Sequence, residues 1–266
     1  MDKYHMSVED NVFYDKRNII DSIWKEANIE GIDVTYPDTQ EVFEGRVVSG
    51  LTVDETVAIN NLKNAWRFIL DNIDAEVNLA FIRQVNGIIG AGLYPSPGDL
   101  RIGDVSIGGT SWKPDLPDFD NVTTEIAEIM SQPASTDRSI DMFSWICRSQ
   151  LFYDGNKRTA QLVANAMLIQ NGNGILAIPV AEKHRWAKLL IDYYETNDSR
   201  KLKDFLKSTS LDGIDIPDKP ARNEKQRTPQ VKVDKSSPAK DGARFEKQAA
   251  DLRKHTAKVP KTGKTV

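Results

Sequence analysis

The sequence predicts a mainly α-helical protein that carries one small β-hairpin. Apolar residues recur at helical spacing through most of the chain between Ser22 and Ser208, which is typical of amphipathic helices. One segment, residues 94–117, differs. It contains Pro and Gly throughout and a short alternating run around Val105 and Ile107, which indicates a loop with a hairpin. With 266 residues, 39% of them hydrophobic, the chain can bury one sizeable core.

The helices are justified by their apolar spacing and their end signals. A short helix is expected in DSIWKEANIEGI, ending at Gly31. The next begins at a capping box, in which the Thr52 hydroxyl bonds a helical N–H and Glu55 reaches back, and it runs to Leu70. The remaining helices are expected at residues 75–89, 122–130, 139–149, 158–170, 177–198 and 199–208.

Composition excludes several classes of protein. No run of about 18 apolar residues exists, so no membrane span is expected. The N-terminus lacks the apolar core of a signal peptide, which makes the cytoplasm the default location. The single cysteine, Cys147, falls in an apolar helical stretch and is expected to be a buried thiol. The three histidines are scattered, so no Cys/His metal site is indicated.

Charge is distributed unevenly along the chain. The formal net charge is −4, yet residues 216–266 carry 14 Lys and Arg against 6 Asp and Glu, which leaves −12 for residues 1–215. The basic segment has few large apolar residues, so we expect it to be disordered or loosely helical. It could be a solubilising tail, or it could contact nucleic acid or an acidic protein.

The stretch SQLFYDGNKRTAQ, residues 149–161, has the pattern of a phosphate-binding loop that opens a helix. A helix N-terminus offers unpaired N–H groups and attracts anions. Gly155 lets the backbone approach a ligand closely, and Lys157 and Arg158 add positive charge. Asp154 could hold a Mg²⁺ ion that bridges phosphates. The alternative is an ordinary Asp-Gly-Asn turn with exposed basic residues.

The longer string QLFYDGNKRTAQ is similar to the signature of the Fic/Doc (Fido) family, His-x-Phe-x-Asp/Glu-Gly-Asn-Gly/Lys-Arg-x-x-Arg. The matching residues are Phe152, Asp154, Gly155, Asn156, Lys157 and Arg158. The segment RIGDVSIGG also resembles the family's Arg-x-x-x-Val-x-Ile-Gly-Gly flap. The resemblance extends roughly from Ser22 to Gly213.

The resemblance implies a Fic-fold helical bundle with a β-hairpin flap. It divides the chain into an N-terminal helical region (1–50), a Fic domain (51–213) and the basic tail (214–266). Family members typically transfer AMP from ATP to a hydroxyl of a protein, and some transfer other nucleotides, a phosphate or a phosphocholine. The implied partners here are a protein with a target Ser, Thr or Tyr hydroxyl, a nucleotide and Mg²⁺.

The same resemblance assigns roles to residues. Phe152 anchors the loop in the core, and Asp154 binds Mg²⁺. The nucleotide-binding positions are Gly155, Asn156, Lys157, Arg158 and Gln161. The flap residues Asp104, Val105, Ser106, Ile107 and Gly108 would pair with an extended target segment by strand addition.

Two departures from the family pattern bear on activity. Gln150 stands where the family has its catalytic His, and an amide cannot act as a base near neutral pH. Loss of a general base typically lowers the rate by about 10²–10⁴. Gln161 replaces the second Arg of the pattern, which helps to hold the terminal phosphate of ATP.

A third feature concerns regulation. Many members carry an inhibitory Ser/Thr-x-x-x-Glu-Gly/Asn segment whose Glu pairs with the second Arg. Glu30 and Gly31 match its end, but Glu26 stands where Ser or Thr belongs. A Glu–Arg pair cannot form with Gln161, although a Glu–amide hydrogen bond could. Glu30 is therefore a candidate inhibitory residue, and the alternative is a helix end capped by Gly31.

Three hypotheses follow. The protein is an atypical nucleotidyl or phosphoryl transferase that modifies protein hydroxyls with impaired general-base function. Alternatively, it is a catalytically inactive Fic-fold module that binds a nucleotide or a partner strand. The third hypothesis, a nucleic-acid-associated accessory protein, depends on the basic tail alone.

Overall fold

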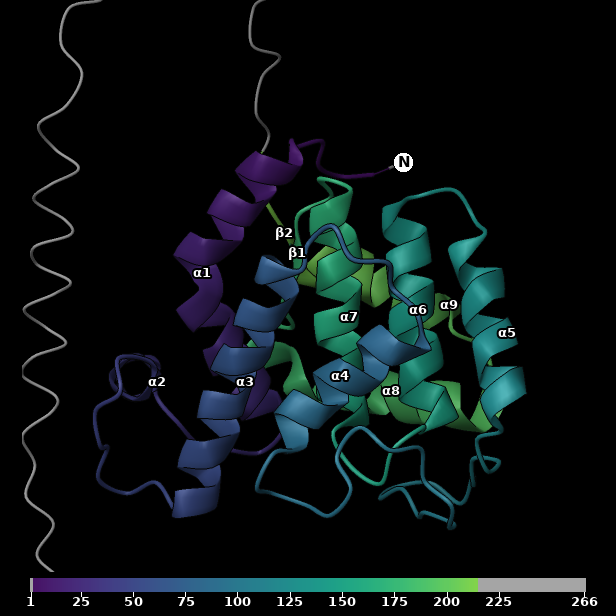
Figure 1. The fold of residues 1–266 in the computed structure, drawn as a ribbon, viewed down its shortest axis with the longest axis horizontal. Helices are drawn as coiled ribbons and strands as arrows, with labels where there is room; N and C mark the ends of the chain where they lie inside the picture. Colours follow the sequence, from purple (N-terminus) through teal and green to yellow (C-terminus); the bar gives the residue numbers. More distant parts are fainter. Residues whose placement is uncertain (1, 215–266) are drawn as a thin grey trace, which may run out of the picture. The chain divides into compact units, whose positions relative to one another are not determined.

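The structure is a computed structural model and describes residues 2–214 (Figure 1). The helices of this part are α1 (Val8–Ile29), α2 (Tyr36–Phe43), α3 (Val53–Asp71), α4 (Leu79–Gly90), α5 (Phe119–Met130), α6 (Thr136–Ser149), α7 (Asn156–Gln170), α8 (Lys183–Thr196) and α9 (Arg200–Phe205). A 3-10 turn (Val180–Glu182) precedes α8, and a π turn (Leu206–Ser210) follows α9. The strands β1 (Ile175–Leu176) and β2 (Leu211–Asp212) pair antiparallel, with Ile175 opposite Asp212.

Helix α7 is the centre of the structure, and α1, α3, α4 and α6 all pack against it (Figure 1). Its residues from Thr159 to Ile169 are buried on every face, because small and apolar side chains follow one another with little interruption. The buried Asn165 is satisfied by both backbone groups of Leu176, at 2.9 and 2.6 Å. This helix therefore fixes where the loop before it can lie.

Most of the predicted helices are confirmed. The capping box at Thr52 and Glu55 is present and starts α3. Helix α1 is much longer than predicted, since it starts at Val8 behind the Ser7 cap. Its first half is not predicted because buried polar residues interrupt the apolar periodicity. Helix α2 is also not predicted, and α4 starts at Leu79 rather than 75 because Asn78 caps it.

The small β-hairpin expected around Asp104–Gly108 is not formed as paired strands. Within residues 2–214, the strands are β1 and β2, and the segment between Arg101 and Asp118 is extended or turned. An alternating sequence becomes a strand only where a neighbouring backbone pairs with it. Here the segment is held at its base by side chains instead, so the flap keeps an unpaired extended backbone.

The described residues form one compact unit, in which α1 packs on both α3 and α7. Residues 1–50 thus share a core with residues 51–213, and the boundary at residue 50 stays a prediction. No helix among the described residues is both apolar enough and long enough to cross a bilayer. The basic tail lies outside the described residues apart from Ile214.

Helix α1 buries two carboxyl groups against the core. Asp15 and Glu26 are 0% and 2% exposed, and both oxygens of Asp15 and one of Glu26 lack a hydrogen-bond partner within the described part of the chain. Burial raises the pKa of Asp15 to about 7 and raises that of Glu26 well above its usual range. These acids are therefore best accommodated in their neutral form.

This burial predicts that stability falls as pH rises. Folded Asp15 holds its proton up to about pH 7, whereas the unfolded chain releases it near pH 4, so the folded state binds more protons in between. Between about pH 5 and pH 8, the unfolding free energy of the wild type should fall. For the Asp15→Asn variant, this fall should be smaller by roughly 3 kcal/mol. Urea unfolding at several pH values measures this difference.

Asp21→Asn is the matched control, because Asp21 lies on the same helix but reaches solvent beside Lys25. The unfolding free energy of Asp21→Asn should change with pH as that of the wild type does. Equal slopes for Asp15→Asn and the wild type would contradict the prediction.

Candidate functional site

A cavity of about 400 Å³ brings together much of the predicted site. The predicted residues that line it are Glu30, Ser106, Ile107, Gly108, Gln150, Asp154, Gly155, Asn156 and Lys157. They come from the end of α1, the flap, and the loop between α6 and α7. Asp104 and Val105 lie on the flap but outside the lining. Arg158 and Gln161 line a smaller neighbouring space that shares Glu30 and Lys157 with this cavity.

The N-terminus of α7 opens into this cavity. Gly155 occupies the cap position with φ +76°, and no side chain caps the helix. The backbone N–H groups of Asn156, Lys157 and Arg158 make no hydrogen bond to any other described residue. Unpaired N–H groups at a helix start bind anions, and the glycine leaves their approach open. The predicted anion-binding loop thus has the backbone arrangement that such a site needs.

Two asparagines hold the loop in shape. The Asn156 side chain accepts from Phe152 N at 3.0 Å and donates to Phe152 O at 2.8 Å. Asn86, on α4, donates to Asp154 O at 3.0 Å and accepts from Gly98 N at 2.8 Å. Phe152 itself is 1% exposed and lies in the core. The loop is therefore fixed by hydrogen bonds between side chains and the backbone rather than by strand pairing.

Arg101 joins the flap to this loop. Arg101 is 1% exposed. Its guanidinium donates to Gln150 O at 2.6 Å, Gly103 O at 2.9 Å and Pro114 O at 3.3 Å, and also to the Asp115 carbonyl. Its backbone N–H donates to Leu151 O at 2.9 Å. Burial lowers the pKa of Arg101, but the carbonyl dipoles around the guanidinium stabilise its positive charge. The Arg101 side chain therefore connects the two ends of the flap, at Gly103 and at Pro114 and Asp115, with the start of the α6–α7 loop at Gln150.

Gln150 is held in place by several contacts. Its backbone is left-handed, with φ +46°, and its Nε2 donates to Cys147 O at 2.6 Å. Its Oε1 accepts from Asn156 Nδ2 at 3.2 Å. The side chain is thus oriented toward the loop with one amide oxygen that can accept a further hydrogen bond, and it has no basic atom.

Glu30 lies against the start of α7. Its carboxylate is 3.1 Å from Lys157 Nζ and 3.8 Å from Arg158 Nε. The Glu–amide hydrogen bond that the sequence allows between Glu30 and Gln161 is not formed, because Gln161 Nε2 points to Leu176 O at 3.4 Å. The carboxylate therefore neutralises the two cations of the loop rather than contacting the residue that replaces the second Arg.

Asp154 is the candidate metal ligand. Its carboxylate is largely exposed at the cavity and is 3.2 Å from Arg158 Nη2. The described residues contain no group of three or more His, Cys, Asp and Glu that could hold a metal ion. Mg²⁺ is commonly held by one or two carboxylates together with substrate phosphates, so a single exposed carboxylate next to an anion site fits it.

Several lining residues are not predicted from the sequence. They are Tyr153, Trp186, Ala187, Leu190, Ile191 and Tyr194. All but Tyr153 belong to α8, where their spacing indicates only a buried helical face. Lys157 Nζ lies 5.7 Å from the Trp186 ring, and the Tyr194 ring stacks on Trp112 with a centroid distance of 5.5 Å. No sequence signal places α8 beside the loop.

Comparison with known proteins identifies the fold. Solved structures with the same arrangement include residues 134–508 of Fic-1 from C. elegans, with a TM-score of 0.64, 17% identity and coverage of 75% of this chain and 66% of that chain. A Fic-domain-containing signaling protein from Bacteroides thetaiotaomicron VPI-5482 gives a TM-score of 0.59, 17% identity and coverage of 70% and 75%. A Fic family protein from Desulfovibrio desulfuricans G20 gives a TM-score of 0.60 and 15% identity, with coverage of 72% of this chain and 62% of that chain.

These neighbours share the helical arrangement of this chain. The chain has the Fic-domain fold. It spans 66% of the C. elegans chain and 62% of the Desulfovibrio chain. No protein-family model matches the sequence, and no curated protein matches it.

The geometry of the loop predicts that Gly155 cannot be replaced by alanine without loss. A Cβ at Gly155 would lie 2.5 Å from Tyr94 Oη and 3.0 Å from Asn86 Nδ2. Gly155→Ala should therefore destabilise the fold by about 1–3 kcal/mol beyond the cost of the positive φ alone. Gly50→Ala measures that cost, since Gly50 has φ +99° and a Cβ added there would meet no atom within 4 Å. Urea unfolding of both variants gives the comparison.

Tyr94→Phe provides a rescue test of the same contact. Its buried hydroxyl has no hydrogen-bond partner among the described residues, so removing it should cost little. The double variant Gly155→Ala/Tyr94→Phe should recover part of the lost stability. Equal losses for Gly155→Ala and Gly50→Ala would contradict the clash.

Proposed function

We propose that the protein binds a nucleoside triphosphate with Mg²⁺ at the start of α7 and transfers its nucleotidyl or phosphoryl group slowly to a hydroxyl of a protein. The observation that supports this most directly is the shared cavity. It combines the open N-terminus of α7, Lys157, Asp154 and the unpaired flap. The Fic-domain fold supports the same proposal, since the Fic motif of the sequence falls on this loop.

The residues have separable roles in this proposal. The N–H groups of Asn156, Lys157 and Arg158, with the two basic side chains, hold the phosphates. Asp154 holds Mg²⁺, which would neutralise charge on the phosphates. The flap backbone around Ser106–Gly108 pairs with an extended segment of the target and keeps its hydroxyl over the cavity.

Gln150 makes the proposed transfer slow. When a hydroxyl oxygen bonds to phosphorus, the bond to the leaving phosphate oxygen breaks and the hydroxyl proton must go to a base or to water. Gln150 Oε1 can accept a hydrogen bond from the hydroxyl and orient it, but it cannot remove the proton. Positioning and charge stabilisation then carry the remaining catalysis.

Nucleotide binding is the first measurement. Calorimetric titration of the full chain with ATP and ADP should show binding that requires Mg²⁺ for full strength, and Asp154→Ala should weaken the Mg²⁺-dependent part at least about tenfold, or roughly 1.4 kcal/mol. Without Mg²⁺, Asp154→Ala should bind at least as tightly as the wild type, because the N–H groups and basic side chains remain and the carboxylate no longer pairs with Arg158.

Asp99→Ala is the matched control for that titration, since Asp99 is an exposed carboxylate that pairs with Arg83 at 2.7 Å. It should bind like the wild type. Glu30→Gln should bind several-fold more tightly, because the Glu30 carboxylate competes with phosphate for Lys157 and Arg158. Glu41→Gln, which alters an exposed pair with Arg46, should bind nucleotide as the wild type does. No binding to any variant would refute the nucleotide site.

Restoring a base tests the transfer. Gln150→His should raise the rate of label incorporation from radiolabelled nucleotides into the protein itself or into lysate proteins by about 10²–10⁴. The added Asp154→Ala substitution should abolish it. Far-UV circular dichroism checks that the left-handed backbone at position 150 tolerates the replacement.

The second candidate is an inactive Fic-fold module that binds a nucleotide or a partner strand, and the amides at Gln150 and Gln161 favour it. Wild-type protein that binds nucleotide but never incorporates label would support this candidate, provided that Gln150→His is active. Slow wild-type transfer that Asp154→Ala abolishes would exclude it.

A further inference from the structure

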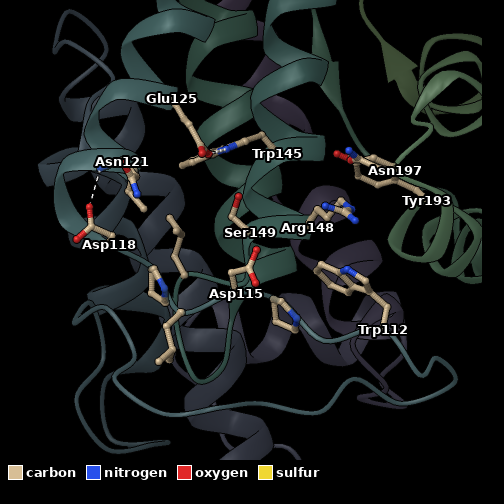
Figure 2. A pocket seen from close by; sticks show the side chains of 15 residues that line it. Trp112, Asp115, Asp118, Asn121, Glu125, Trp145, Arg148, Ser149, Tyr193 and Asn197 are labelled. Carbon is tan, nitrogen blue, oxygen red and sulfur yellow. Dashed lines mark hydrogen bonds between the residues drawn. The ribbon is translucent and has the colours of Figure 1, made fainter.

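A second cavity of about 390 Å³ is lined in part by the end of the flap segment (Figure 2). The segment Trp112–Asp118, helix α5, the end of α6 and the end of α8 form its walls. No residue lines both this cavity and the proposed nucleotide cavity. The two sites are nevertheless adjacent, because Ser149 and Leu151 line this cavity and Gln150 between them lines the other.

The second cavity has an excess of negative charge. Asp115, Asp118 and Glu125 line it, against one cation, Arg148. None of the three carboxylates forms a salt bridge with another described residue. In Figure 2, Asp115 lies near Ser149 in the middle of the site, with Asp118 on one side and Arg148 on the other. Asp118 and Glu125 accept hydrogen bonds from Asn121 N and the Trp145 indole, but no cation among the described residues neutralises their charges. Carboxylates without a salt-bridge partner in a concave surface attract cations.

Aromatic side chains form part of the wall. The Arg148 guanidinium lies 4.5 Å from the Trp112 ring, so one cation of the protein is already stacked there. Trp145 is half-buried and donates its indole N–H to Glu125 Oε2 at 2.6 Å. Within the described residues, its ring faces no other aromatic ring or cation. A ring held beside a carboxylate is a suitable surface for a guanidinium or ammonium group.

We propose that this cavity binds a basic side chain of an extended polypeptide, with arginine preferred over lysine. The negative charge selects a cation, and the planar Trp145 ring favours the planar guanidinium. The proposed polypeptide is the one that crosses the flap, and this part of the inference rests on the proposed function. A target would then carry a basic residue near the hydroxyl that enters the nucleotide cavity.

Peptide binding tests the cavity without any nucleotide. Short fluorescein-labelled Gly/Ser peptides that contain two arginines, two lysines or two glutamates are titrated with the full-length protein, and anisotropy is followed. The arginine peptide should bind most tightly and the glutamate peptide least. The double variant Asp115→Asn/Glu125→Gln should bind the arginine peptide about tenfold more weakly. Gln at position 125 keeps an acceptor for the Trp145 indole.

Asp120→Asn/Glu128→Gln is the matched control, because both residues are exposed on α5, carry the same charge and lie outside the cavity lining. It should bind the arginine peptide like the wild type. Equal weakening in both double variants would overturn the proposal, since it would show attraction by general negative charge. Thermal unfolding shows that the variants remain folded.

The indole N–H signals locate the peptide. In protein labelled with ¹⁵N-tryptophan, the arginine peptide should shift the signals of Trp112 and Trp145 and leave those of Trp24 and Trp66 unchanged. A shift of Trp186 alone would place the peptide in the nucleotide cavity and overturn the proposal. Binding at Trp145 in a protein that fails to bind ATP would sustain the cavity while refuting the nucleotide site.

Discussion

The buried guanidinium of Arg101 is the interaction on which the site depends. It donates to the carbonyls of Gln150, Gly103, Pro114 and Asp115, which come from three segments of the chain. No carboxylate among the described residues forms a salt bridge with it, so its desolvation is compensated by oriented backbone dipoles. Because one side chain binds all four carbonyls, the flap and the α6–α7 loop are positioned together.

This arrangement explains how an irregular loop can present a defined site. Strand pairing fixes most β-hairpins, but here the flap has no partner strand among the described residues and retains free backbone groups. Arg101 holds its base, while Asn86 and Asn156 hold the loop. The rigid helix α7 then directs its unpaired N–H groups into the cavity. A flap fixed at its base but unpaired along its length is suited to accept an extended segment of another chain.

The sequence predicts the parts of the fold that depend on local signals. The capping box at Thr52, the apolar run after Arg158 and the Asp-Gly-Asn turn all act over a few residues, and the structure confirms the helices that they start or stop. The first half of α1 is not predicted, since Asn11 and Asp15 are polar residues on a buried face. Nor does the sequence place Trp186 or Tyr194 at the cavity, because packing of α8 beside the loop is a tertiary contact.

The two features that bear on activity are physically independent. The proposed anion binding depends on backbone N–H groups, on the absence of a side chain at Gly155 and on Lys157, and none of these involves position 150. Gln150 keeps the contacts that hold its side chain, with Cys147 and Asn156 as partners. In the proposed mechanism, an amide at the position of a base therefore removes proton transfer but leaves the architecture of the proposed nucleotide site. A protein of this kind should lose rate before it loses ligand affinity, which is why binding and transfer have to be measured separately.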